Sequence, residues 1–224
     1  MNGNLKNAVH LLNQIMDGKL IVFEGVEGCG KTTQIHLCHQ WLQSLGVDVV
    51  VTRQPGGTDL GAHIRQLLLD SGKNSISNRA ELLLYAADRA QHVEQLLLPN
   101  LAAGKTVLCD RYTDSTIAYQ CFGRGLNREL IDNLNHIATT GLHSDLTLWL
   151  DIDVATGLAR KIKSGEAPDR IEQEKIEFHH RVQQGYKFLA NTHPERIRRI
   201  DASLTQEVVH KQIQTILTAK LGSH

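Results

Sequence analysis

The chain has 224 residues, and its 24 Lys and Arg balance its 24 Asp and Glu, so its formal net charge at pH 7 is zero. Such a chain has no overall positive field to hold a nucleic-acid backbone, and no apolar run approaches the roughly 18 residues of a membrane span, so we expect neither partner. The length suits one α/β domain, and four cysteines without C-x-x-C spacing favour a reducing cytoplasm over a secreted disulfide framework.

We expect the first 17 residues to form an N-terminal extension that precedes the first predicted strand. Leu5, Val9, Leu12 and Met16 have near-helical spacing, so a short docking helix and a frayed extension both remain open.

From residue 18 to residue 221, apolar β-rich runs alternate with helical patterns. The predicted strands are residues 20–23, 47–52, 106–110, 146–151 and 197–201. The predicted helices are residues 31–45, 58–69, 80–103, 128–140, 154–163, 172–191 and 205–221. This order predicts a three-layer α/β sandwich, in which helices cover both faces of a parallel five-stranded sheet and ligands gather at the carboxyl ends of the strands.

The segment after the first predicted strand fits the phosphate-binding pattern G-x-x-x-x-G-K-[ST] without a mismatch. Its glycines let backbone N–H groups converge on phosphate oxygens, and the helix predicted to follow adds its positive end. Lys31 would place a charge beside the β- and γ-phosphates, and Thr32 would offer a hydroxyl to Mg²⁺. We therefore expect a nucleoside triphosphate to bind at Gly25, Val26, Glu27, Gly28, Cys29, Gly30, Lys31 and Thr32.

Two further strands end in charged residues at the same predicted edge. Asp110 and Arg111 end the third strand, where Asp110 can hold Mg²⁺ directly or through water and Arg111 can grip a phosphate with two hydrogen bonds. Arg53 ends the second strand, just before the sharp turn that Pro55 and two glycines predict. We expect all three side chains to face the phosphate-binding loop.

A segment interrupted by Gly and Pro, from about residue 160 to 171, joins two predicted helices. It carries Arg160, Lys161, Lys163 and Arg170, which predicts a basic lid that closes over the triphosphate and neutralises charge on the transferred group. A solvated connection between helices is the plainer alternative.

Taken in order, these motifs make the chain resemble the thymidylate kinases. The matching segments are TRQPGGT at residues 52–58, LLLYAADR at 82–89, DRYTDSTIAYQ at 110–120 and DRIE at 169–172, in addition to the phosphate loop. The resemblance covers about residues 19–186 and implies a P-loop kinase fold with a short lid. It further implies a homodimer that transfers the γ-phosphoryl of MgATP to dTMP, giving dTDP and ADP in dTTP synthesis.

The resemblance also implies how the acceptor is recognised. Tyr85 would stack on thymine and Arg89 would donate to its O4, which opposes cytosine because the cytosine amino group is also a donor. Glu27 would accept the sugar 3′-hydroxyl, and Tyr119 would crowd the 2′ position. Arg53 and Arg111 would bind the acceptor phosphate, with Ser115, Thr116 and Gln120 lining the pocket.

The sequence departs from the family pattern in two places. Gln54 stands where the family usually has Glu, which removes a carboxylate near the expected metal and monophosphate. The phosphate loop lacks an arginine, so the resemblance implies that Arg160 or Arg170 from the lid acts on the γ-phosphate, with Lys161 and Lys163 as weaker versions.

Other functions remain to be compared with this one. A regulatory GTPase would need D-x-x-G and N-K-x-D elements, and neither occurs in the sequence. Another P-loop nucleoside monophosphate or deoxynucleoside kinase is the principal alternative, and an ATP-binding module without turnover is a further one.

Overall fold

The computed structural model describes residues 18–70, 76–163, 165 and 167–221, and its centre is a sheet of parallel strands. In chain order they are β1 (Lys19–Glu24), β2 (Val49–Arg53), β3 (Thr106–Asp110), β4 (Leu146–Asp151) and β5 (Ile197–Asp201). Their order across the five-stranded sheet is β2-β3-β1-β4-β5. The predicted parallel sheet is confirmed, and the expected N-terminal extension lies outside the described residues.

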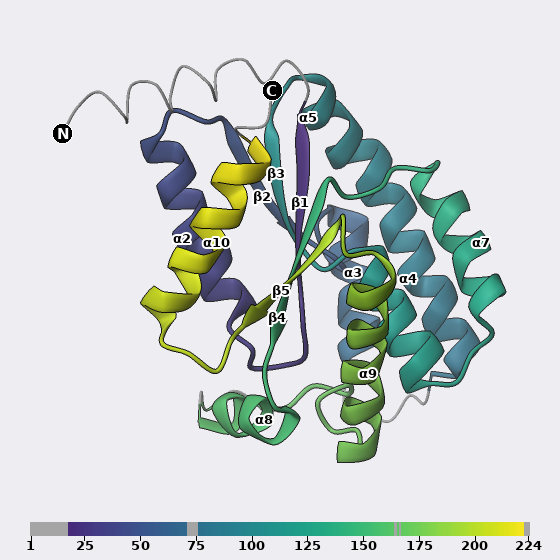
Figure 1. The fold of residues 1–224 in the computed structure, drawn as a ribbon. Helices are drawn as coiled ribbons and strands as arrows, with labels where there is room; N and C mark the ends of the chain where they lie inside the picture. Colours follow the sequence, from purple (N-terminus) through teal and green to yellow (C-terminus); the bar gives the residue numbers. More distant parts are fainter. Residues whose placement is uncertain (1–17, 71–75, 164, 166, 222–224) are drawn as a thin grey trace.

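Helices cover both faces of the sheet, as Figure 1 shows. One face carries α2 (Lys31–Ser44) and α10 (Gln206–Leu221), and the other carries α4 (Asn78–His92), α7 (Arg128–Thr139) and α9 (Ile176–Thr192). The remaining helices are α3 (Asp59–Leu69), η1 (Val93–Leu97), α5 (Leu98–Ala102), α6 (Thr113–Thr116), η2 (Ile117–Gly123) and α8 (Val154–Lys163). The three-layer arrangement predicted from the alternation is therefore confirmed.

Burial explains why the central strands could be identified from their composition. In β1 and β4 nearly every residue is buried, since helices cover both sides of a parallel sheet. The edge strand β5 differs because Arg198 and Arg199 are exposed between the buried Ile197 and Ile200. Strand edges tolerate such charges, so β5 was the least distinct strand in the sequence.

Two helical segments differ from expectation. The helix expected over residues 80–103 is divided by η1, a π-helical stretch just before Pro99. Proline cannot donate to the carbonyl four residues earlier and its ring crowds it, which accounts for a widened turn at this point. Residues 113–123 were not predicted to be helical, yet α6 and η2 occupy them.

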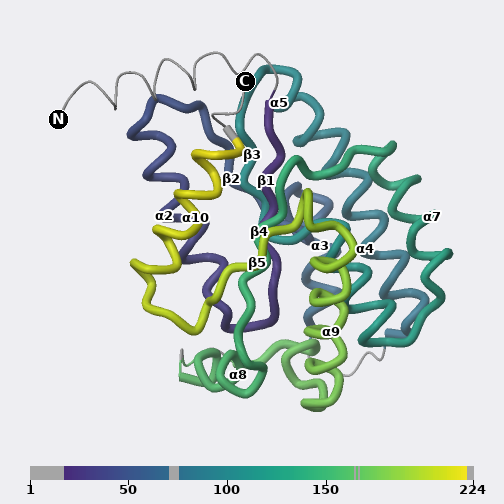
Figure 2. The backbone as a smooth tube through the Cα atoms, viewed as in Figure 1, coloured from purple at the N-terminus to yellow at the C-terminus, as the bar shows by residue number. Residues whose placement is uncertain are grey.

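The strand register gathers the charged strand ends at one edge. Asp110 pairs with Phe23 on one side and with Arg53 on the other, so Glu24, Arg53 and Asp110 lie at nearly the same level. The chain then leaves β4, forms α8 beyond this edge and enters α9, as Figure 2 shows. Among the described helices, none is both long and apolar enough to cross a bilayer.

Candidate active site

The phosphate-binding loop lies between β1 and α2, and its backbone takes conformations that favour glycine. Gly25, Gly28 and Gly30 have φ angles of 143°, 69° and 95°. A Cβ at Gly28 would come within 2.0 Å of the Gly157 carbonyl oxygen, so the loop packs backbone to backbone against α8. Gly30 precedes α2 without a capping side chain, which leaves N–H groups of the helix start available to an anion.

Lys31 is folded back onto this loop. Its Nζ donates to the carbonyl oxygens of Gly25 at 3.1 Å and Val26 at 3.3 Å. Gly28, Lys31 and Thr32 line two cavities, one of about 370 Å³ and a second that continues past Cys29 and Gly30 toward the start of α10. Lys31 Nζ also lies 3.6 Å from Cys29 Sγ, so all three of its N–H donors have acceptors within its own loop.

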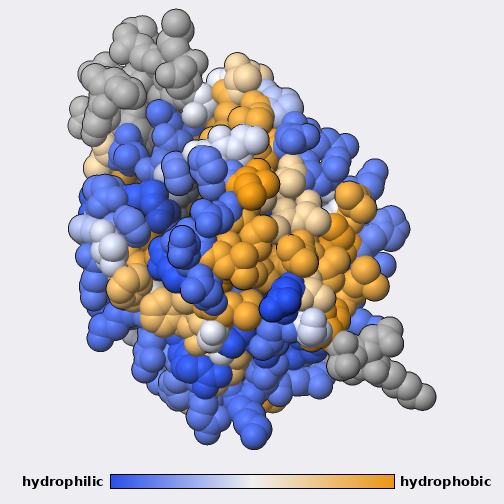
Figure 3. Space-filling view, turned by 90° about the vertical axis from the view of Figure 1, so that its right-hand side faces the viewer, coloured by the Kyte–Doolittle hydropathy of each residue, from blue (hydrophilic) through white to orange (hydrophobic). Residues whose placement is uncertain are grey.

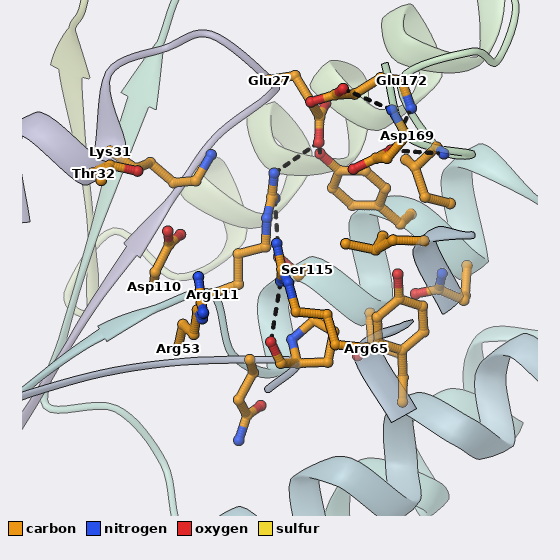
Figure 4. Close-up of a pocket in the computed structure, with 18 of the residues that line it drawn as sticks. Glu27, Lys31, Thr32, Arg53, Arg65, Asp110, Arg111, Ser115, Asp169 and Glu172 are labelled. Atoms are coloured by element: carbon orange, nitrogen blue, oxygen red, sulfur yellow. Dashed lines mark hydrogen bonds and ion pairs between the residues drawn. The ribbon is translucent and has the colours of Figure 1, made fainter. Parts of the chain in front are cut away.

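Four guanidinium groups line the first cavity, and sequence reasoning found three of them. Arg53, Arg89 and Arg111 were predicted, whereas Arg65 comes from α3 and donates to the Pro55 carbonyl at 3.1 Å. Burial, and then the charge of Arg53, lower the pKa of Arg65. In Figure 4, Arg53 lies beside Asp110, and the side chains of Arg65 and Arg111 reach toward the centre of the view. Like charges gathered in a pocket repel one another unless an anion lies between them, so the arrangement fits a phosphate.

Arg111 holds its position through a left-handed backbone conformation, with φ 68°. This conformation is uncommon outside glycine and persists where its surroundings fix it. Here the Arg111 N–H donates to the Phe23 carbonyl at 3.0 Å, and the next N–H, that of Tyr112, donates to Glu24 Oε1 at 2.9 Å. β1 therefore fixes the turn that aims Arg111 into the cavity.

Glu24 is a buried carboxylate that the sequence analysis missed. It is fully inaccessible, yet it accepts from the Ser115 N–H at 3.1 Å, the Ser115 hydroxyl at 2.6 Å and the Tyr186 hydroxyl at 2.7 Å. Burial raises its pKa, although Arg111 and these donors act in the opposite direction. An acid at the end of an apolar strand directly before the glycine loop was the signal that could have identified it.

Glu27 connects the loop with Arg111 and with η2. Its Oε1 accepts from Arg111 Nη2 at 2.8 Å and from the Tyr119 hydroxyl at 2.7 Å. Burial alone would raise the pKa of Glu27, but the charges of Arg111 and Lys31 outweigh it and lower that pKa. Glu27 is thus held as a carboxylate, and Figure 4 shows it next to the guanidinium end of Arg111.

Arg89 also lines this cavity, although it is largely buried and nearly all of its N–H donors already have acceptors. Its Nε donates to Gln54 Oε1 at 2.9 Å, and its Nη1 to Thr116 Oγ1 and Asn135 Oδ1, each at 2.7 Å. Its Nη2 donates to the Tyr112 carbonyl at 3.0 Å. A guanidinium has five N–H groups, so within the described residues one N–H of Nη2 remains for a ligand.

The other predicted pocket residues lie around Arg89. Tyr85 is one turn before it on α4, which places both on the same helix face, and burial raises the pKa of the Tyr85 phenol. Gln120 also lines the cavity, and its amide donates to Glu81 Oε1 at 2.9 Å. Ser115 and Thr116 complete the wall as acceptors of hydrogen bonds from Arg111 and Arg89.

The basic residues of the predicted lid contact different parts of the protein. Arg160 lines the second cavity and donates to the Ala202 carbonyl at 3.1 Å. Arg170 bonds to Glu81 and to the Leu68 carbonyl, away from the phosphate loop. Lys161 lines both cavities and lies 3.4 Å from Glu172. The structure therefore brings Arg160 and Lys161, but not Arg170, to the loop, and the catalytic role of each stays a prediction.

Asp110 and Thr32 are the predicted metal ligands. Asp110 lines the first cavity, and its Oδ1 is buried without a hydrogen-bond partner among the described residues. An acceptor-only atom in that state suits a cation. No group of three or more His, Cys, Asp or Glu suited to a metal occurs in the described part of the chain.

Most of the chain resembles proteins of one family. Residues 23–213 match the family model described as thymidylate kinase. A thymidylate kinase of Nostoc punctiforme is 67% identical over 207 residues, which cover 92% of this chain and 98% of that protein. The chain belongs to the thymidylate kinase family. Phosphorylation of dTMP to dTDP with ATP as donor is the activity of this family.

More distant relatives agree with this assignment. The thymidylate kinase of Pelotomaculum thermopropionicum is 50% identical over 198 residues, 88% of this chain and 92% of that protein. The crystal structure of thymidylate kinase from Ehrlichia chaffeensis superposes with a TM-score of 0.74 at 32% identity, over 90% of this chain and 99% of that one. The likeness therefore extends to the fold as well as the sequence.

Proposed function

We propose that the first cavity binds dTMP and the glycine loop binds the triphosphate of ATP, so that the two phosphates meet beside Lys31. The observation that carries this proposal is the convergence of Arg53, Arg65 and Arg111 on a cavity that the loop also lines. Two mutually repelling phosphates need cations between them, and the positive end of α2 adds to these three groups.

The base and the sugar of dTMP fit the rest of the same cavity. Arg89 has one N–H left for thymine O4, and Tyr85 lies one turn away on the same helix. The carboxylate of Glu27 suits the sugar 3′-hydroxyl, and Tyr119 lies against it with its hydroxyl 2.7 Å from Oε1. These placements support acceptance of a deoxyribonucleotide whose pyrimidine presents an acceptor.

The reaction needs little covalent chemistry from the protein. The acceptor phosphate oxygen is already anionic, so it attacks the γ-phosphorus without a strong general base. Thr32 and Asp110 would hold Mg²⁺, which when bound neutralises charge on the triphosphate oxygens. Lys31, released from the carbonyls of Gly25 and Val26, stabilises the charge that develops on the transferred group. Arg160 and Lys161 close the cavity from α8.

A coupled assay of ADP release tests the proposal. The enzyme is incubated with MgATP and, separately, with dTMP, dCMP, dGMP, AMP and free thymidine. Turnover that depends on dTMP supports the assignment. Turnover confined to another monophosphate or to the free nucleoside would select the alternative kinase instead, and ATP binding without any turnover would select a silent module.

We also propose that the chain works as a homodimer in the cytoplasm. Figure 3 shows apolar side chains gathered on the side where α4 and α7 lie, and exposed there are Leu83 at 50%, Leu130 at 43% and Ile137 at 71%. A second copy would cover such a surface. All four cysteines are free, which agrees with a reducing compartment.

Light scattering after gel filtration tests the dimer. Ile137→Glu would place a charge in the interface and shift the protein to monomer. Val208→Glu, at an apolar position that is 46% exposed on α10 at the opposite face of the sheet, is the control and should not change the mass. A monomeric unmodified protein would contradict this part of the proposal.

A further inference from the structure

His179 and Glu27 face each other inside the protein without completing a hydrogen bond. His179 Nδ1 lies 3.7 Å from Glu27 Oε2, and the side chains are 1% and 12% exposed. Both ring nitrogens of His179 and this carboxylate oxygen are buried, and none has a hydrogen-bond partner among the described residues. Buried polar atoms are almost always satisfied, so two such groups side by side call for a structural or functional explanation.

The two oxygens of Glu27 differ in what they can still accept. Oε1 already accepts two hydrogen bonds, from Arg111 Nη2 and the Tyr119 hydroxyl. A carboxylate oxygen has two lone pairs, so Oε1 has no acceptor site left and both sites of Oε2 are open. One open site faces His179; Oε2 is itself buried, so a ligand in the cavity that Glu27 lines reaches the other site only after the carboxylate rotates toward that cavity.

The imidazole is held firmly enough to act as a fixed donor. His179 lies on α9, which packs closely against η2, and the neighbouring Phe178 ring meets it edge-on with 5.4 Å between ring centroids. Phe178 in turn packs against Tyr119, which donates to Glu27. A shift of less than an ångström in the Glu27 side chain would bring Oε2 to hydrogen-bond distance of Nδ1.

We propose that His179 is a positioning residue for sugar recognition: when the acceptor nucleotide binds, it donates its Nδ1–H to Glu27 Oε2 and orients that oxygen to accept the 3′-hydroxyl. This inference rests on the proposed function, in which Glu27 receives the hydroxyl. Glu27 then has four hydrogen bonds, from Arg111, Tyr119, His179 and the sugar, which fill its acceptor sites. The structure thereby assigns part of the preference for a 3′-hydroxyl to a helix that contributes no residue to the phosphate loop.

The test compares two acceptors, dTMP and its 3′-deoxy analogue, across three variants. His179→Phe removes the donor in a shape close to that of neighbouring Phe178, and His179→Gln retains an N–H donor. His180→Phe is the matched control, because His180 is the next residue of the same helix and is exposed.

We expect His179→Phe to raise the KM for dTMP about tenfold, the effect of losing one hydrogen bond to a charged group, with kcat nearly unchanged. The same variant should leave the KM for the 3′-deoxy analogue within about twofold of the unmodified enzyme, because that analogue does not use the oriented oxygen. His179→Gln should recover most of the loss, and His180→Phe should match the unmodified enzyme with both acceptors.

An equal rise in KM for both acceptors, or no rise for dTMP, would overturn the role of His179, since either result means a structural histidine only. If His179→Phe does not fold, the imidazole ¹⁵N spectrum of the unmodified protein decides. Binding of dTMP should shift the Nδ1 signal of His179 and the 3′-deoxy analogue should not, and absence of this difference overturns the inference. Failure of the proposed function looks different: the unmodified enzyme would then show no turnover with dTMP, or no preference for it over the 3′-deoxy analogue.

Discussion

The hydrogen bonds around His92 fix its protonation state, and acid should therefore weaken the protein through this residue. The ring is fully buried, with Nδ1 2.6 Å from Gln54 Nε2 and Nε2 2.7 Å from Thr52 Oγ1. Gln54 Oε1 accepts from Arg89, so its amide nitrogen must donate to Nδ1, which therefore carries no proton. Burial, and then the charge of Arg89, lower the pKa of His92 to about 4.

The size of the effect follows from the two pKa values. The unfolded chain has a histidine pKa of 6.5, so between that value and about 4 it binds more protons than the native state. Stability contributed by neutral His92 is therefore present at neutral pH and is lost as the pH falls through this window. Linkage gives a loss of about 2 kcal/mol near pH 5 and about 3 kcal/mol near pH 4.

Urea unfolding of the unmodified protein and His92→Gln, near pH 7.5 and near pH 5, measures this loss. Glutamine cannot titrate, so the stability difference between the two proteins should shift by about 2 kcal/mol against the unmodified one on acidification. His180→Gln, at an exposed position, serves as the control and should show no such shift. Gln54→Glu should reduce the loss, because a carboxylate accepts from both Arg89 and a charged imidazole.

A stability difference that stays constant between the two pH values would refute the reasoning. It would mean that His92 titrates alike in the folded and unfolded states, which requires that Gln54 accept from a protonated ring. The Gln54 amide would then have to be reversed, with its oxygen toward His92 and its nitrogen facing Arg89, and two donors would oppose each other there.

Three other variants test the remaining assignments. Lys31→Ala should lower kcat about a hundredfold or more while the circular dichroism spectrum stays unchanged, because its charge acts on the transition state; near-normal turnover would remove it from the mechanism. Arg89→Ala should raise the KM for dTMP and weaken discrimination against dCMP, measured as the ratio of kcat/KM values, and unchanged selectivity would place base recognition elsewhere. Leu148→Ala, at a fully buried position in β4, should cost about 2–5 kcal/mol in urea unfolding and leave kcat unchanged where the variant is folded.

The strands were predictable because buried strands consist largely of apolar residues. A parallel sheet covered on both faces needs continuous apolar runs such as residues 20–23 and 146–151, and the turn signals between them separate the elements. The helical segment at residues 113–123 was not predictable in the same way. Its start depends on Glu24, whose carboxylate binds the N–H groups of Tyr112 and Ser115 from a distant strand. The sequence of residues 113–123 does not show that a carboxylate from β1 accepts hydrogen bonds at the start of this segment.

The side chains of the site also fall into two groups, those that local sequence could predict and those that it could not. Glycine loops and strand ends follow local rules, so Lys31, Arg53 and Asp110 could be placed from the sequence. The direction of a long arginine on a helix or in a loop depends on partners from elsewhere in the chain. The hydrogen bond to the Pro55 carbonyl holds Arg65 at the cavity, whereas the hydrogen bond to Glu81 holds Arg170 away from the phosphate-binding loop. Spacing alone cannot distinguish these two outcomes.

The two halves of the site differ in how much they must rearrange. Arg89 is held by hydrogen bonds to Gln54, Thr116, Asn135 and Tyr112, so the groups that would read the base are in place before the acceptor arrives. Lys31, in contrast, donates to two carbonyls of its own loop and would have to leave them to act as proposed. Preorganisation lowers the cost of binding, while a step that needs movement delays the chemistry. The base side of the site is therefore preorganised, whereas the lysine of the phosphate-binding loop is still bound to its own backbone.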